Sequence, residues 1–166
     1  MRLIARIYRT VLVVTFLAVG SLGVYVIVDG GPDTCQTDLC CVDCESAAVA
    51  RVIDGDTLVV GRRFRRDQRV RLYGVDAPER GERCAAEATS RLRELAGDRV
   101  RLQSGPRAED VYERRLYYLF TDSGDSIDEL LVREGLGRAW TRDGQHRESL
   151  VKLERQTRNA GIGCLW

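Results

Sequence analysis

The sequence predicts an α+β fold in which a small five-stranded barrel carries three helices and follows an apolar N-terminal helix. Three observations lead to this prediction. Short β-branched runs open the domain, with helical patterns inserted among them and trailing after them. Residues 11–28 contain no charged side chain. About 120 residues follow position 45, which is enough for one compact domain.

Residues 11–28, VLVVTFLAVGSLGVYVIV, are predicted to form a transmembrane helix. Eighteen helical residues rise about 27 Å, close to the thickness of the hydrocarbon core. Three arginines precede this segment and acidic residues follow it, so residues 1–10 are expected in the cytoplasm and everything after Asp29 outside. The alternative is a cleaved signal peptide, whose apolar region is usually shorter. The domain would then be secreted, whereas an anchor keeps it on the outer face of the cell membrane.

Residues 29–45 are rich in Gly, Pro, Asp and Cys, and are predicted to be a tether in front of a domain at 46–166. The tether contains four cysteines: Cys35, Cys40, Cys41 and Cys44. Their spacing differs from that of standard zinc fingers. An oxidising compartment favours local or intermolecular disulfides. Metal binding, lipidation and free thiols remain alternatives.

Five strands are predicted within the domain. Residues 48–60 contain two β-branched runs that meet at the turn Asp54-Gly55-Asp56, and residues 68–76 contain a third, alternating run. Two further runs cover residues 99–102 and 116–121.

Three helices are predicted between and after these strands. The first follows a helical pattern through Ala85, Ala88, Leu92 and Leu95 and ends near Gly97. The second begins with a capping box formed by Ser126 and Glu129, and the third covers residues 145–160. This element order is typical of an OB-type barrel with added helices.

Net charge gives no sign of nucleic-acid binding. The chain carries a formal charge of +1, and because three arginines and no acid precede Asp29, the remainder carries −2. One ten-residue window is nevertheless strongly basic, with Arg62, Arg63, Arg65, Arg66, Arg69 and Arg71. This window is either a phosphate-binding surface or a solvated hairpin.

Carboxylates occur in two short motifs. Asp54 and Asp56 flank a glycine, and Asp76 and Glu79 lie on either side of Pro78. Such oxygen ligands suit calcium or magnesium rather than zinc. Hydrolysis of a phosphodiester needs a hard cation, a base for water and fixed positive charge, and the sequence contains residues for each. An Asp-Gly-Asp turn alone is also typical of a plain backbone turn.

Four separated motifs together resemble the staphylococcal-nuclease (thermonuclease) family: VIDGDT at 52–57, RLYGVDAPE at 71–79, DVYERRLYYL at 110–119 and the C-terminal LW. The resemblance covers nearly all of residues 50–166. It implies the OB-fold barrel with three helices. It also implies a calcium-dependent endonuclease that hydrolyses DNA, RNA or both.

The resemblance further implies roles for individual residues. Asp56 and Asp76 would bind calcium together with the backbone carbonyl of Ala77, at a position where threonine is common. Asp54 would orient these ligands without touching the ion. Glu79 would be the general base that activates water.

Two arginines complete the implied catalytic set. Arg71 would bind the phosphate. Arg114 would neutralise the developing charge and assist the leaving oxygen. Glu113 and Arg115 depart from the glycine-flanked pattern of the family, so Arg115 is a second candidate. Replacing Arg71 or Arg114 is expected to reduce turnover with little effect on thermal stability.

The remaining expectations concern two aromatic residues, one histidine and two cysteines. Tyr112 and Trp140 would flank the nucleotide, with core packing as the alternative for each. His146, at the start of the last helix, is expected to have a surface or capping role. In this family the C-terminus packs near the first helix, which implies a disulfide between Cys84 and Cys164.

Two other functions are compatible with this fold: a catalytically silent nuclease-like module that binds nucleic acid, and a structural surface protein. Silent modules typically lose the metal carboxylates and the arginines. The sequence retains both sets, which favours the enzyme.

Overall fold

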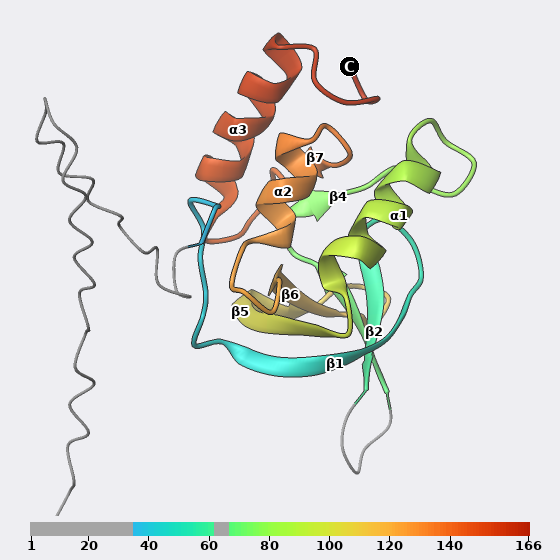
Figure 1. Ribbon diagram of the computed structural model, residues 1–166, viewed down its shortest axis with the longest axis vertical. Coiled ribbons are helices and arrows are strands. Elements are labelled where there is room, and N and C mark those ends of the chain that lie inside the picture. Colours follow the sequence, from blue (N-terminus) through green and yellow to red (C-terminus); the bar gives the residue numbers. More distant parts are fainter. Residues whose placement is uncertain (1–34, 62–66) are drawn as a thin grey trace, which may run out of the picture. The chain divides into compact units, whose positions relative to one another are not determined.

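The structure is a computed structural model that describes residues 35–61 and 67–166 (Figure 1). The predicted cytoplasmic segment at 1–10 and the predicted membrane span at 11–28 lie outside these ranges, as do four of the six clustered arginines. Among the residues that are described, none of the helices is long and apolar enough to cross a membrane.

Five strands form the predicted closed barrel. They are β1 (Glu45–Val52), β2 (Thr57–Gly61), β3 (Gln68–Leu72), β5 (Arg99–Glu109) and β6 (Arg115–Phe120). Their order around the barrel is β1-β2-β3-β6-β5, and β1 and β5 also pair with each other. Only the β3–β6 pair is parallel. This topology fits the predicted OB-type barrel.

Three helices, also predicted, lie on one side of the barrel (Figure 1). They are α1 (Ala85–Ala96), α2 (Ile127–Arg133) and α3 (Arg147–Asn159). Each buries apolar residues against the barrel core, such as Leu92 and Ala96 of α1 and Leu150 of α3.

A second, two-stranded sheet was not predicted. It pairs β4 (Val75–Asp76) with β7 (Arg138–Ala139), so that Asp76 lies opposite Arg138. Strands of two residues are too short to show an alternating pattern.

Residues 35–44 belong to the folded unit, which differs from the predicted tether at 29–45. The backbone N–H groups of Asp38 and Leu39 donate to the carboxylate of Glu129 at 3.1 and 2.8 Å. Glu129 is only 3% exposed, so these hydrogen bonds satisfy a buried charge. The segment is therefore held by the second helix.

The capping box predicted for α2 is half formed. Ser126 Oγ accepts the N–H of Glu129 at 3.1 Å. The side chain of Glu129 does not return to the N–H of Ser126, which donates instead to Thr37 Oγ1 at 2.8 Å. The Cys-rich segment thus supplies the second half of the cap.

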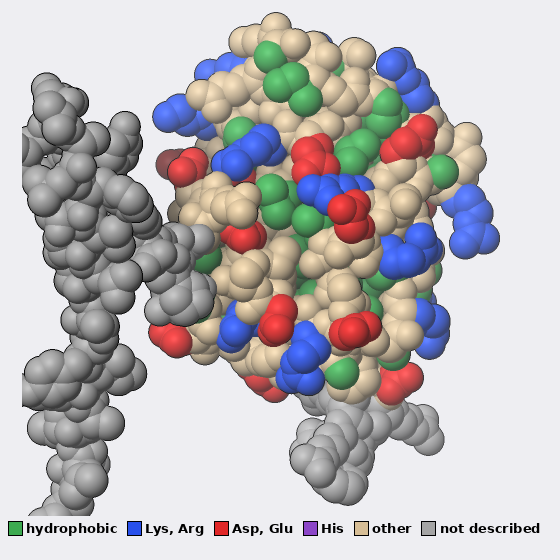
Figure 2. Space-filling view, in the orientation of Figure 1, with side chains coloured by type: hydrophobic (Ala, Val, Ile, Leu, Met, Phe, Trp, Pro, Cys, Tyr) green, Lys and Arg blue, Asp and Glu red, His purple; other side chains and the backbone are tan. Residues whose placement is uncertain are grey.

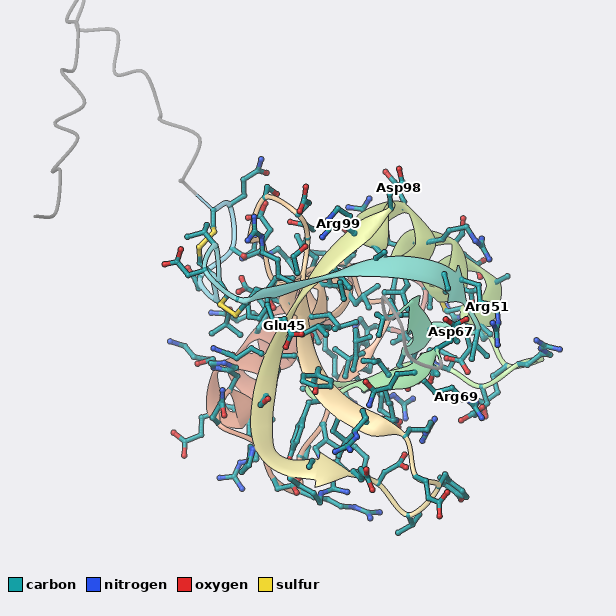
Figure 3. The ribbon with its side chains drawn as sticks, turned by 90° about the horizontal axis from the view of Figure 1, so that it is seen from below. Glu45, Arg51, Asp67, Arg69, Asp98 and Arg99 are labelled. Atoms are coloured by element: carbon teal, nitrogen blue, oxygen red, sulfur yellow. A yellow bond between two sulfur atoms is a disulfide. The ribbon has the colours of Figure 1, made fainter. Side chains whose placement is uncertain are left out.

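All six cysteines are paired in three disulfides, and each bond is intramolecular. Cys35–Cys40 and Cys41–Cys44 close two small loops beside Glu45, where Figure 3 shows them in yellow. The alternatives of a metal site and of free thiols therefore do not hold. Cys84–Cys164, the pairing implied by the family resemblance, has a Cα–Cα distance of 5.8 Å.

We expect the double variant Cys84→Ser/Cys164→Ser to lower the free energy of unfolding by up to about 4 kcal/mol, because the bond joins residues 80 positions apart. Guanidinium unfolding without reductant measures the change. Cys35→Ser/Cys40→Ser is the control, since it opens a loop with a separation of 5 residues and should cost only about 2 kcal/mol. Equal losses would contradict the chain-entropy explanation.

Candidate active site

Arg71, on β3, lies at the centre of a polar cluster where β2, β3 and β4 meet. Its side chain is 9% exposed, and its Nη2 atom lies 3.1 Å from Asp56 Oδ2 and 2.6 Å from Asp76 Oδ1. Its Nη1 atom donates to the carbonyl oxygens of Leu72 and Val75 at 2.9 and 3.1 Å. Four acceptors therefore fix the position of the guanidinium group.

The turn before β2 brings the carboxylate of Asp56 to Arg71. Strand pairing places Thr57 opposite Arg71. Gly55 allows the turn to approach α1 closely, because a Cβ atom there would lie 2.7 Å from the Cβ of Ala77 and 2.8 Å from that of Ala88. The glycine of the Asp-Gly-Asp motif is therefore needed for packing.

Asp56 is buried, with 7% of its surface exposed. Its carboxylate accepts hydrogen bonds from Thr57 Oγ1 at 2.8 Å and from the N–H of Ala77 at 3.3 Å. Burial raises the pKa of Asp56 to about 6, against the opposing charge of Arg71. Asp54 Oδ1 accepts the N–H of Asp56 at 3.2 Å, which stabilises the turn.

The oxygen atoms at this place match the ligand preference of a hard cation. Asp56 and Asp76 converge on one nitrogen atom of Arg71 and therefore face a common point. Across residues 35–61 and 67–166, no group of three or more His, Cys, Asp or Glu side chains is placed to hold a metal ion. A cation at the two carboxylates would need further ligands, such as a backbone carbonyl, water or a substrate phosphate.

Glu79 is exposed in the loop between β4 and α1. Its backbone N–H donates to Glu82 Oε2 at 2.9 Å, which anchors the loop. Its own carboxylate makes no hydrogen bond or ion pair to any residue that the structure describes. An exposed, unengaged carboxylate is open to water, as a general base must be.

Arg114 reaches the cluster through a threonine. Its Nη1 atom lies 3.3 Å from Thr57 Oγ1, the same hydroxyl that donates to Asp56. Arg115 instead pairs with a glutamate on β5. Of the two candidate arginines, Arg114 is the one that lies next to the carboxylates.

Asp110 sets the conformation of the loop that carries Arg114, a role that the sequence did not indicate. Its carboxylate accepts the N–H groups of Tyr112 and Arg114, both at 2.9 Å, and pairs with Arg114 Nε at 2.6 Å. Burial would raise the pKa of Asp110, but these hydrogen bonds outweigh it and hold the pKa below its usual value.

The two predicted substrate-stacking residues differ in exposure. Tyr112 is 75% exposed, and its ring centroid lies 5.4 Å from the guanidinium carbon of Arg114. Trp140 is half-buried and packs against the core, with Arg71 and Arg142 at 5.3 and 5.1 Å from its ring. Trp140 thus combines core packing with a place beside the site.

His146, for which a surface or capping role was expected, is half-buried. It occupies the N-cap position of α3, but its side chain makes no capping hydrogen bond. The ring packs edge-on against Tyr118, and its Nε2 atom lies 2.8 Å from Gln103 Oε1. Burial lowers the pKa of His146.

Charges are mixed where they can be seen on the described surface. Figure 2 shows acidic and basic side chains interspersed on one face, which agrees with the near-zero net charge. Figure 3 shows Arg51, Asp67 and Arg69 together at one end of the barrel. Arg71, in contrast, points into the polar cluster, so the basic window does not form a single surface along its described residues.

Asp128 supports the turn that carries the site, and this role was not predicted from the sequence. It is fully buried. Its Oδ1 atom accepts the N–H of Gly74 at 2.8 Å, and its Oδ2 atom accepts that of Leu119 at 2.9 Å. Gly74 lies in the turn between Arg71 and Asp76, so Asp128 holds the turn that positions both. An acid in the first turn of a helix is ordinarily explained by the helix dipole. For this reason the contact with Gly74 could not be predicted from the sequence.

We expect Asp128 to make stability depend on pH. Burial raises the pKa of Asp128 to about 7 from its usual 3.8, so the folded state retains a proton that the unfolded state loses between these values. The stabilisation from this retained proton is fully present below pH 3.8 and is lost as the pH rises through about 7. The free energy of unfolding falls by up to about 4 kcal/mol over this range. Urea unfolding of metal-free protein at pH 5 and pH 8 measures this loss. Asp128→Asn should be less stable but should show a smaller difference between the two pH values, and an unchanged difference would exclude Asp128 as its source.

The fold and the site together define a class of protein: a small five-stranded barrel domain in which two carboxylates converge on a buried arginine and a second arginine lies beside them. Comparison with known proteins is consistent with this class. Residues 69–166 match the family described as staphylococcal nuclease homologue.

Individual relatives cover most of the chain. It is 35% identical over 144 residues to a thermonuclease of Staphylococcus intermedius, with 81% of each chain covered. It is 28% identical over 158 residues to a thermonuclease of Staphylococcus hyicus, covering 89% of this chain and 90% of the relative. It is 31% identical over 127 residues to a micrococcal nuclease of Shigella flexneri, with 71% of each covered. The chain belongs to the staphylococcal nuclease family.

Proposed function

We propose that this protein is a calcium-dependent nuclease that hydrolyses phosphodiester bonds in DNA, RNA or both. The observation that carries the proposal is the convergence of Asp56 and Asp76 on the buried guanidinium group of Arg71. The relatives named thermonuclease and micrococcal nuclease support it.

Each residue of the cluster has a distinct role in this proposal. Asp56, Asp76 and the carbonyl oxygen of Ala77 would hold calcium, which would supply Lewis-acid polarisation of the phosphate. Glu79 accepts a proton from the attacking water. Arg71 binds the phosphate oxygens. Arg114 neutralises the charge that develops as the 5′-oxygen leaves.

We also propose that residues 11–28 anchor the enzyme in the cell membrane with its catalytic domain outside. The support is the uncharged 18-residue run with arginines before it. Fractionation of cells should recover the full-length protein with membranes. A shortened, soluble form lacking roughly the first 24 residues would favour a cleaved signal peptide.

Cleavage by the full-length protein in detergent tests the proposed activity. Single-stranded DNA, double-stranded DNA and RNA are incubated with calcium, with magnesium or with a chelator. We expect cleavage with calcium, less with magnesium because of its stricter octahedral geometry, and none above background with chelator. Undiminished cleavage with chelator would overturn the calcium mechanism, and binding without cleavage would indicate a silent module.

A further inference from the structure

A cavity of about 440 Å³ opens beside Asp76. It is lined by the loop after β4, the residues before α1, strand β7 and the C-terminal tail, including Pro78, Arg83, Arg138 and Leu165. Its volume lies within the range of small-ligand sites, roughly 300–1,000 Å³. The proposed catalytic roles assign nothing to this cavity beyond the metal ligands at its edge.

Two arginines on the wall of the cavity are available to bind an anion. Neither Arg83 nor Arg138 takes part in the ion pairs found among residues 35–61 and 67–166. Both are exposed. Arg138 is held in place, because its guanidinium carbon lies 5.8 Å from the ring centroid of Trp166.

Sheet pairing brings one of these arginines next to the proposed metal site. Asp76 and Arg138 are opposite each other in the β4–β7 pair, so their side chains leave the same face of the sheet. An anion on Arg138 would therefore lie beside a phosphate bound to a cation at Asp76.

A disulfide links two of the chain segments that line the cavity. Cys84 follows Arg83 directly, and Cys164 precedes Leu165 directly. The bond between them ties the start of α1 to the C-terminal tail, and thereby links the chain segments that contribute Arg83 and Leu165 to the lining.

The charged residues that line the cavity indicate that an anion would bind once a cation is present. Two acids, Asp76 and Glu82, accompany the two arginines, so the cavity is balanced without a cation. A divalent cation at Asp76 would make the lining positive. The cavity is then suited to the anionic part of the molecule that the metal site holds, with Pro78 and Leu165 as apolar contacts for a sugar.

We propose that this cavity binds the nucleotide next to the cleaved bond, with Arg83 and Arg138 contacting its phosphate. The proposal rests on the proposed nuclease function and adds a substrate subsite to it. It makes the enzyme prefer oligonucleotides over the smallest diester. This preference requires a charged phosphate on the nucleotide next to the cleaved bond.

Short substrates of defined length test the proposal on the full-length protein with calcium. A dinucleotide with one phosphodiester is compared with trinucleotides extended on the 5′ or the 3′ side. A second pair of trinucleotides carries an uncharged methylphosphonate at the added linkage. We expect the extension on one side to raise kcat/KM by about tenfold, and the methylphosphonate to abolish that gain.

The gain should fall to less than twofold in Arg83→Ala/Arg138→Ala and to an intermediate value in Arg83→Ala, where no packing contact is lost. Arg155→Ala is the matched control, since it removes an exposed arginine of α3 away from the cavity, and it should keep the full gain. An unchanged gain in the double variant would overturn the subsite. Absence of cleavage of every substrate by the wild type would instead overturn the proposed function.

Discussion

Arg71→Ala is expected to reduce turnover by at least about 10³-fold, because the guanidinium group supplies fixed positive charge at the phosphate. The structure adds a second effect, contrary to the expectation from sequence that stability would hardly change. Asp56 is buried against Arg71, so removing the arginine leaves a carboxylate without its partner. Breaking a buried pair in this way costs about 3–5 kcal/mol.

Steady-state kinetics and guanidinium unfolding measure the two effects separately. Arg71→Lys keeps the charge but cannot reproduce the four contacts of the guanidinium group, so it should recover much of the stability and little of the turnover. Arg115→Ala, on the neighbouring strand, should change both by little. If Arg71→Ala kept wild-type turnover, Arg71 would have no part in catalysis.

Glu79→Gln is expected to lower kcat by roughly 10²- to 10⁴-fold, the range for loss of a general base. Here stability should not change, because the carboxylate of Glu79 makes no hydrogen bond or ion pair with any described residue, and its backbone contact with Glu82 survives the substitution. Calcium binding should persist, since the metal carboxylates are untouched.

Turnover of Glu79→Gln is measured with saturating calcium, and isothermal titration reports its calcium affinity. Glu87→Gln, an exposed glutamate in the first turn of α1, is the matched control and should behave as wild type. A loss of less than tenfold in Glu79→Gln would assign proton transfer to another group. A loss of calcium binding would mean that Glu79 is a metal ligand instead.

The parts of the fold that the sequence predicted well are those with a local signal. The five barrel strands and three helices follow from alternation, helical spacing and glycine at helix ends, and the structure confirms them. The carboxylates and arginines were found because each lies in a short motif. The structure brings Asp56, Asp76, Arg71 and Arg114 together, while their chemical roles remain predictions.

The parts that were missed depend on contacts between residues distant in sequence. Asp128 reaches Gly74 across 54 positions, and Glu129 reaches Leu39 across 90. In a sequence, both acids look like ordinary first-turn residues of a helix. The Cys-rich segment likewise has the composition of a linker, and only its contacts with distant residues, such as Glu129 and Ser126, show that it is folded.

The length of β5 has a consequence for how copies of this protein behave when they are crowded. Only residues 99–102 of this strand pair with β1, so the part beyond them has one open edge, which is the kind of surface that recruits strands from other molecules. Pro106 lacks the N–H that such pairing needs. Pairing with β6 is also irregular between Ser104 and Glu109. A barrel whose open β5 edge is interrupted in this way should resist strand pairing between copies when they are crowded.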